Sequence, residues 1–160
     1  MTDCRVGLGL DFHCLVPDRP LILGGIEIPN DVGLLGHSDA DVLIHAVCDA
    51  LLGAAGLGDI GTHFPDTDEA YRGISSLVLL ARVIEKLADL GFRPVNVDAT
   101  VIAERPKLVP RFPAMRDALC PVLGLSPERL GLKATTSEGM GAIGRGEGIG
   151  AMAVCLIETV

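Results

Sequence analysis

Aromatic side chains are almost absent from this 160-residue sequence, which has no tryptophan, one tyrosine and four phenylalanines. Even so, 49% of its residues are hydrophobic and only 21% are charged, so the apolar mass is mainly leucine, valine, isoleucine and alanine. A chain of this length can bury a substantial core, but surface-to-volume scaling leaves much of such a composition exposed on one small domain. We therefore predict that copies of the chain associate into a homo-oligomer.

Positive charge is also scarce, because 13 lysines and arginines face 21 aspartates and glutamates, a formal net charge of -8. A negative surface repels nucleic acid and anionic lipid, so we expect neither a nucleic acid nor a membrane as a partner. The longest apolar runs are too short to cross a bilayer. A small anionic substrate remains compatible with this charge where metal ions, cationic side chains or backbone amides gather locally.

The five cysteines form no CxxC pair, and the first residues lack the charged start and apolar core of a signal peptide. We read the cysteines as reduced thiols, mostly in the core, and predict a cytoplasmic protein. The sequence also has no Walker phosphate-binding loop. A GxGxxG pattern is present at Gly139, Gly141 and Gly144, but we reject a dinucleotide site because no helix is predicted after it and the chain ends before an acidic ribose partner.

No repeat, low-complexity tract or linker divides the sequence, so we treat residues 1–160 as one domain. Hydrophobic patterns predict strands over residues 5–15, 96–103, 130–136 and 149–157, and a short hairpin formed by residues 21–23 and 25–28. They predict helices over residues 38–55, capped by Ser38, over 75–90, closed by Gly91, and over 110–123, with a short extra turn at 126–128 and a loop over 56–68. This order favours an α/β fold (an α+β sandwich) with one mixed sheet and helices packed on one face.

Two short patterns indicate a metal site. Asp11 and His13 are two residues apart on a predicted strand, so they point to the same face. His45 lies on a predicted helix that is apolar around most of its circumference, where an unpartnered histidine would be costly to bury. A divalent cation on His45, with Asp41 or Asp49 orienting the ring from behind, removes that cost. Two histidines and a carboxylate leave one tetrahedral position open, as in a catalytic zinc site.

A second pattern lies at the end of a predicted strand, where residues 133–138 read KATTSE. Hydroxyl groups and backbone amides there can hold phosphate oxygens, and Glu138 can hold a hard cation such as magnesium between two phosphates. An ordinary strand end explains the same residues, so the pattern alone does not decide between the two readings.

Six stretches together resemble the 2-C-methyl-D-erythritol 2,4-cyclodiphosphate synthase family, from one end of the sequence to the other. They read GLGLDFH, GLLGHSDADVLIHAVCDALLGAAGLGDIG, FPDTD, RPKL, KATTSEG and GRGEGIG, in this order. The resemblance implies a lyase of the non-mevalonate isoprenoid pathway that acts on 4-diphosphocytidyl-2-C-methyl-D-erythritol 2-phosphate. The product would be 2-C-methyl-D-erythritol 2,4-cyclodiphosphate, with release of CMP.

The resemblance also implies roles for individual residues. Asp11, His13 and His45 match zinc ligands, Glu138 matches a magnesium or manganese ligand, and His37 and Thr136 match positions that stabilise the transition state. The implied substrate-binding residues, which include several of these, are Asp11, His13, His37, Ser38, Asp59, Ile60, Gly61, Phe64, Pro65, Asp66, Thr67, Asp68, Ala103, Glu104, Arg105, Pro106, Lys107, Leu108, Val109, Thr135, Thr136, Ser137, Glu138, Ala142 and Arg145. Leu8, Gly139 and Ala142 depart from residues that are common in the family.

The resemblance further implies a homotrimer with each active site between adjacent subunits. The strand over residues 149–157 is apolar on both faces, which predicts burial by its own core and by neighbouring subunits. Arg145 and Glu147 would ring an apolar central cavity, for which an isoprenoid diphosphate is a candidate ligand. Two other functions stay open: a zinc hydrolase that cleaves a phosphate ester, and a non-catalytic oligomeric binder of isoprenoid diphosphates.

Overall fold

The structure of the protein, a computed structural model, describes residues 2–160. The elements in chain order are β1 (Cys4–Pro17), β2 (Leu21–Leu23), β3 (Ile26–Ile28), β4 (Val32–Leu34), α1 (Val42–Ala55), α2 (Ile60–His63), η1 (Glu69–Tyr71), α3 (Ser76–Asp89), β5 (Phe92–Ile102), η2 (Val109–Arg111), α4 (Phe112–Leu123), η3 (Pro127–Arg129), β6 (Leu130–Thr135), α5 (Gly141–Gly144) and β7 (Gly148–Thr159). Within this range, no helix is long and apolar enough to cross a membrane.

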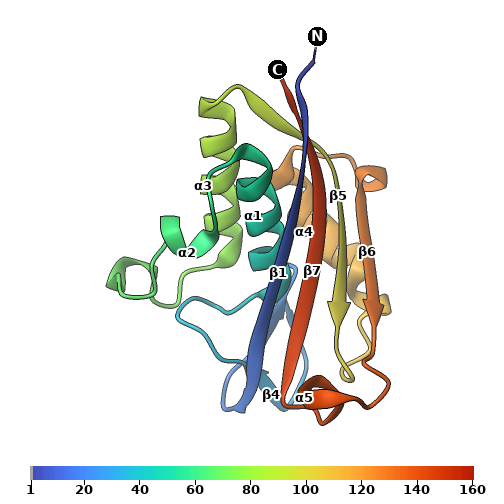
Figure 1. The fold of residues 1–160 in the computed structure, drawn as a ribbon. Coiled ribbons are helices and arrows are strands. Elements are labelled where there is room, and N and C mark those ends of the chain that lie inside the picture. Colours follow the sequence, from blue (N-terminus) through green and yellow to red (C-terminus); the bar gives the residue numbers. More distant parts are fainter. Residues whose placement is uncertain (1) are drawn as a thin grey trace.

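Five of the strands form one mixed sheet in the order β4-β1-β7-β5-β6, and β2 pairs with β3 in a separate hairpin. Within the large sheet, β5 and β6 are parallel and the other pairs are antiparallel. Figure 1 shows α1, α3 and α4 on the same side of this sheet. The mixed sheet with helices on one face is the predicted architecture, and the 21–28 hairpin is confirmed.

The central helix α1 is buried along most of its length, including Leu43, Ile44 and Leu51, as its apolar sequence predicts. Its start was predicted wrongly. Asp41, and not Ser38, is the N-cap, because the Asp41 carboxylate accepts a hydrogen bond from the Ile44 amide at 3.1 Å. The other Asp41 oxygen accepts from the Gly25 amide at 2.7 Å, so one fully buried side chain caps the helix and ties it to the β2–β3 hairpin.

Two glycines let β1 lie directly on α1. A Cβ atom at Gly7 would be 1.8 Å from the Ala50 carbonyl oxygen, and one at Gly9 would be 1.8 Å from the Ala46 carbonyl oxygen. Side chains on a strand alternate between faces, so Asp11 and His13 continue the same face of β1 beyond Gly9. The close contact thereby brings them next to the turn of α1 that carries His45.

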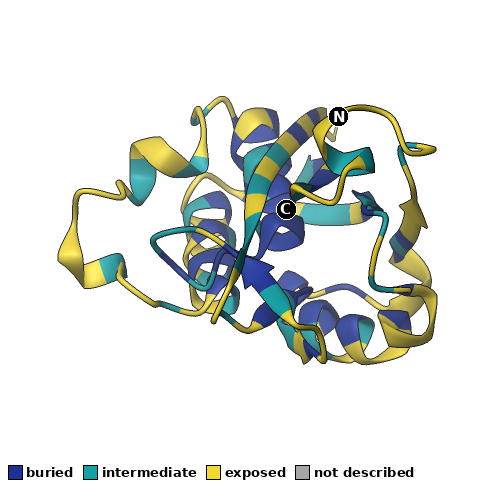
Figure 2. Cartoon of the chain, turned by 90° about the horizontal axis from the view of Figure 1, so that it is seen from below, coloured by how far each residue is buried: buried dark blue, intermediate teal, exposed yellow. Residues whose placement is uncertain are grey.

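The other face of the sheet is apolar and exposed in the single chain. Val6, Leu8 and Phe12 of β1 have 68%, 62% and 55% of their surface exposed, and Met152 and Val154 of β7 have 42% each. The alternation of buried and exposed residues along the long strands is visible in Figure 2. In the single chain β7 is therefore buried on one face by the core, and burial of its other face by neighbouring subunits stays a prediction.

Other differences concern short elements in segments rich in glycine, proline or aspartate. The loop predicted over residues 56–68 contains α2, and strand β4 was not predicted. The GxGxxG glycines lie around α5, a four-residue helix within the motif, so no long helix follows them, as expected. Of the five cysteines, Cys48, Cys120 and Cys155 are buried, Cys4 and Cys14 are exposed, and all five are free thiols.

Candidate active site

The three predicted metal ligands converge at the end of the β1–α1 contact. Asp11 Oδ2 lies 3.0 Å from His13 Nε2 and 3.1 Å from His45 Nδ1, and these two nitrogens are 3.2 Å apart. All three side chains are partly buried. One carboxylate oxygen and two imidazole nitrogens thus face a common point.

This donor set fits a tetrahedral metal ion. Zinc binds nitrogen and oxygen ligands at about 2.0–2.1 Å, which places neighbouring tetrahedral ligands about 3.3 Å apart. The three observed separations are close to that value. The backbone also prepares His13, because the Leu35 carbonyl oxygen accepts from Nδ1 at 2.5 Å, which leaves the lone pair of Nε2 for a metal. The triad can therefore hold a divalent cation and leave a ligand position open.

Proton affinities within the triad reflect the same proximity. Burial alone would raise the pKa of Asp11, but hydrogen bonds and charge interactions with His13 and His45 outweigh it and hold the pKa well below its ordinary value. Burial would lower the pKa of His13, whereas its contacts with Asp11 and the Leu35 carbonyl raise it. A carboxylate that stays ionised is the form that a cation requires.

The residues behind His45 differ from the prediction. Asp41 caps α1, and Asp49 accepts a hydrogen bond from the Ile60 amide at 2.7 Å, so neither orients the His45 ring. The ring nitrogen that points away from the triad, Nε2, instead lies near the hydroxyl groups of Ser38 and Ser76. Sequence reasoning missed Ser76 because it is 31 residues from His45 in the chain, at the start of another helix.

Two of the triad residues, His13 and His45, line a cavity of about 490 Å³. The other predicted residues along its wall are His37, Ser38, Ile60, Gly61, Phe64, Pro65, Asp66 and Thr67. Gly36, Tyr71 and Leu79 also line it and were not predicted. His37 is held over this cavity because its Nε2 donates a hydrogen bond to the Asp68 carbonyl oxygen at 3.0 Å. The 36–38 segment and the 60–67 segment therefore meet in front of the metal ligands.

The aspartates at both ends of the 60–67 segment shape the backbone. Asp59 caps α2 by accepting from the Thr62 amide at 2.8 Å, and Asp68 caps η1 by accepting from the Ala70 amide at 2.9 Å. Neither is among the residues that line the 490 Å³ cavity. Both were predicted to bind substrate, and in the free chain they stabilise the loop that carries the cavity wall.

A second cavity of about 450 Å³ lies where β5 and β6 end. Its predicted lining residues are Ala103, Glu104, Pro106, Lys107, Leu108, Val109, Thr135, Thr136 and Glu138, and Pro110 and Ala134 also contribute. Because β5 and β6 are parallel, the loops after both strands meet at the same edge of the sheet. This cavity shares no residue with the 490 Å³ cavity in front of the triad. Predicted residues Arg105 and Ser137 are not part of its lining.

Glu104 organises the loop that carries Glu138. Its carboxylate accepts hydrogen bonds from the Ser137 amide at 2.9 Å, from the Ser137 hydroxyl at 3.0 Å and from the Gly139 amide at 3.3 Å. These bonds hold the pKa of Glu104 below its ordinary value. Between the two anchored residues, Glu138 adopts a left-handed conformation with φ of 53° and stays exposed. The carboxylate of Glu104 is thus engaged by three hydrogen bonds, whereas that of Glu138 accepts only one, from the Thr136 hydroxyl at 3.4 Å, at the wall of the 450 Å³ cavity.

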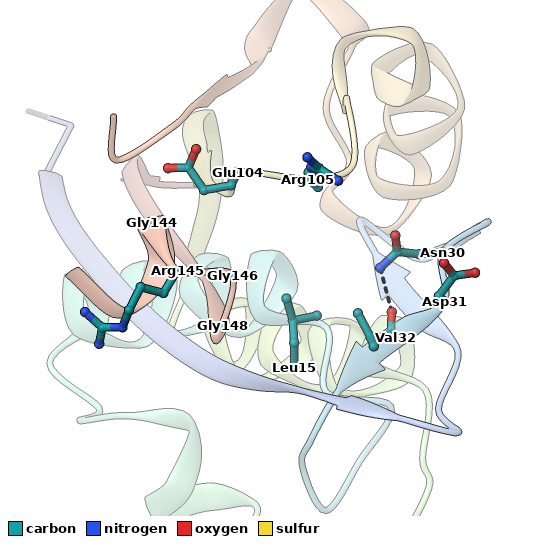
Figure 3. A pocket seen from close by; sticks show the side chains of 10 residues that line it. All are labelled: Leu15, Asn30, Asp31, Val32, Glu104, Arg105, Gly144, Arg145, Gly146 and Gly148. Carbon is teal, nitrogen blue, oxygen red and sulfur yellow. Dashed lines mark hydrogen bonds between the residues drawn. The ribbon is translucent and has the colours of Figure 1, made fainter. Parts of the chain in front are cut away.

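The remaining predicted residues lie elsewhere. Ala142 lines a small cavity of about 180 Å³ together with Phe12 and His13. Arg145 lines a third large cavity, of about 560 Å³, which Glu104 and Arg105 also line (Figure 3). Arg145 also pairs with Glu147 at 2.6 Å, so the two charges are balanced within the chain.

The mixed sheet with a triad of one carboxylate and two imidazoles beside an open cavity defines a protein of the metal-dependent enzyme class. The chain belongs to the YgbB family, whose sequence model matches residues 4–158. A protein of Symbiobacterium thermophilum called 2-C-methyl-D-erythritol 2,4-cyclodiphosphate synthase is 63% identical over 95% of this chain and 97% of its own length.

Solved structures agree with this assignment. A 2C-methyl-D-erythritol-2,4-cyclodiphosphate synthase in a CDP-bound form is 42% identical, with a TM-score of 0.88 over 96% of this chain and 99% of that one. The bifunctional IspDF of Campylobacter jejuni is 40% identical, with a TM-score of 0.96 over all of this chain. The present chain spans only 43% of that bifunctional protein.

Proposed function

We propose that this protein converts 4-diphosphocytidyl-2-C-methyl-D-erythritol 2-phosphate to 2-C-methyl-D-erythritol 2,4-cyclodiphosphate and releases CMP. The observation that carries the proposal is the convergence of Asp11, His13 and His45 at a cavity wall that also presents His37 and Ser38. The names of the relatives and the CDP-bound neighbour support the choice of substrate class. The family match over residues 4–158 supports one domain for this activity.

We assign zinc to the triad and magnesium or manganese to Glu138. Two imidazoles and a carboxylate suit zinc. Magnesium is commonly bound by one or two protein carboxylates together with substrate phosphates, and the exposed Glu138 carboxylate fits that role. When bound, such cations act as Lewis acids on phosphate oxygens and neutralise the charge that builds up on them.

The protein's own groups position the reactants. The substrate's 2-phosphate is anionic at neutral pH, so its oxygen can attack the β-phosphorus without a strong general base, while the bond from that phosphorus to the CMP oxygen breaks. His37 donates Nε2–H to the Asp68 carbonyl, which leaves its Nδ1 for the cavity. Lys107 and the Thr136 hydroxyl line the second cavity, where they can hold the diphosphate of the cytidyl group.

We further propose a homotrimer in which the 490 Å³ cavity of one subunit faces the 450 Å³ cavity of the next. Two cavities without a shared residue and an exposed apolar sheet face containing Leu8, Phe12 and Val154 support association. Arg145 and Glu147 would lie around the central cavity, where an isoprenoid diphosphate is a candidate ligand. The free cysteines support a cytoplasmic location. The net negative charge supports the absence of nucleic acid and membrane partners.

Product analysis tests the reaction. Purified protein with zinc and magnesium should turn the cytidyl substrate into CMP and a cyclic diphosphate, identified by ³¹P NMR. A zinc hydrolase, the main alternative, would give a linear product, and that result would refute the proposal. A binder without catalysis would leave the substrate intact. His45→Ala serves as the control, because it removes one triad ligand from the buried helix while the 450 Å³ cavity stays unchanged.

A further inference from the structure

A chain of hydrogen bonds extends behind His45, away from the metal triad. His45 Nε2 lies 3.0 Å from the Ser76 hydroxyl oxygen, and Ser76, the first residue of α3, is fully buried. The Ser76 hydroxyl makes a short hydrogen bond to Asp39 Oδ1, and the Ser76 amide donates to Asp39 Oδ2 at 2.9 Å. The contacts therefore run from the Asp39 carboxylate through the Ser76 hydroxyl to the His45 ring, whose other nitrogen faces Asp11 and His13.

The donor and acceptor roles in this chain follow from Asp39. An ionised carboxylate can only accept, so the hydroxyl proton of Ser76 points to Asp39. The Ser76 oxygen then presents a lone pair to His45, and the ring nitrogen facing it must carry the proton. A neutral imidazole protonated at Nε2 has its lone pair on Nδ1, which is the atom that faces Asp11 and His13.

A second hydroxyl lies at the same nitrogen but plays a different part. Ser38 Oγ is 3.2 Å from His45 Nε2, yet it also accepts from the Ala40 amide at 3.2 Å and lines the 490 Å³ cavity. Ser76 does not line that cavity. Ser38 is thus available to a ligand in the cavity, whereas Ser76 and Asp39 act from behind the ring.

We propose that Ser76 and Asp39 are positioning residues that hold His45 in the tautomer and orientation required for metal binding through Nδ1. Asp39 also links the segment before α1 to the start of α3, because its amide donates to the Ile74 carbonyl at 3.0 Å. Histidine ligands depend on such partners, whose loss commonly weakens metal binding 10- to 100-fold. This inference rests on the proposed metal site at Asp11, His13 and His45.

The test measures metal affinity without turnover, by competition between the protein and a chromogenic zinc chelator. Ser76→Ala removes the hydroxyl group but keeps the hydrogen bond from the residue 76 backbone amide to Asp39. We expect this variant to bind zinc about 10- to 100-fold more weakly than the unmodified protein. The adjacent Ser75→Ala is the matched control, because Ser75 is exposed and its side chain makes no capping hydrogen bond. Ser75→Ala should bind zinc as the unmodified protein does.

Two further measurements separate this role from a structural one and from failure of the site. Thermal unfolding of the metal-free proteins should give similar midpoints for both serine variants, and ¹⁵N NMR of the zinc-loaded protein should show His45 protonated at Nε2. Asp39→Asn, which places an amide donor near the Ser76 hydroxyl, should also weaken zinc binding. Zinc affinity of Ser76→Ala within twofold of Ser75→Ala would overturn the inference while the metal site stands. Unchanged zinc binding by His45→Ala would overturn both.

Discussion

The contact between β1 and α1 predicts a large effect for Gly9→Ala. The new Cβ atom would lie 1.8 Å from the Ala46 carbonyl oxygen, whereas real Cβ contacts shorter than 3.0 Å essentially never occur, so the strand and helix must separate by about 1.2 Å. The obstacle is backbone and not the end of a flexible side chain. Overpacking of this kind costs about 1–3 kcal/mol of unfolding free energy, and more where the backbone cannot yield.

The same movement should disturb the metal ligands. Asp11 lies two residues after Gly9 on the strand, and His45 directly precedes Ala46 on the helix, so a shift at this contact separates atoms that now lie 3.1 Å apart. A displacement of about 1 Å at a reacting site can cost about 100-fold in rate. We therefore expect Gly9→Ala to lose both stability and zinc affinity.

Urea unfolding and zinc competition would measure the two effects. Gly53→Ala is the matched control, since a Cβ atom there would approach nothing closer than the Leu8 carbonyl oxygen at 4.0 Å. Gly53 is exposed within α1, so alanine should stabilise the protein by about 0.5–1 kcal/mol through helix propensity. If the unfolding free energy and the zinc affinity of Gly9→Ala equal those of the unmodified protein, the reasoning about this contact is refuted.

Other substitutions address the metals, the buried carboxylate and the exposed sheet face. His45→Ala should lose stoichiometric zinc and turnover, and full activity of a zinc-free preparation in strong chelator would contradict the assignment. Glu138→Gln should keep its zinc but lose activity that high magnesium or manganese partly restores; loss of zinc would argue against separate metal sites. Burial raises the pKa of Asp41 from 3.8 to about 6, so its contribution to stability is present below pH 3.8 and is lost as the pH rises through 6. That loss is about 3 kcal/mol, and Asp41→Asn should flatten it in unfolding experiments between pH 4 and 7. Phe12→Glu should lower the mass seen by light scattering at micromolar concentration, and an unchanged mass would exclude this face from the interface.

Local periodicity explains what could be predicted. Asp11 and His13 share a face because strand side chains alternate, and His45 lies on a helix whose apolar residues leave little surface for solvent. Both patterns depend only on neighbours in the chain, so the strand, the helix and the ligand set could be predicted before the structure was known. The Gly24–Gly25 hairpin is equally local.

Contacts between distant segments could not be predicted in this way. Ser38 and Asp41 are both good N-cap residues, and the choice of Asp41 depends on the Gly25 amide, which only the packed hairpin brings within 2.7 Å. Ser76 is placed behind His45 by the packing of α3 against α1, so no spacing in the sequence signals it.

The sequence alone predicts the chemistry available at the site: two imidazoles and a carboxylate as candidate metal ligands, and one glutamate after a strand as a candidate ligand for a second cation. Only the packed fold shows which groups hold these ligands, and that the two cavities share no residue within one chain. The physical reason is that residue identity and periodicity act over a few residues. Hydrogen-bond partners across 30 residues exist only once hydrophobic burial has packed the helices onto the sheet.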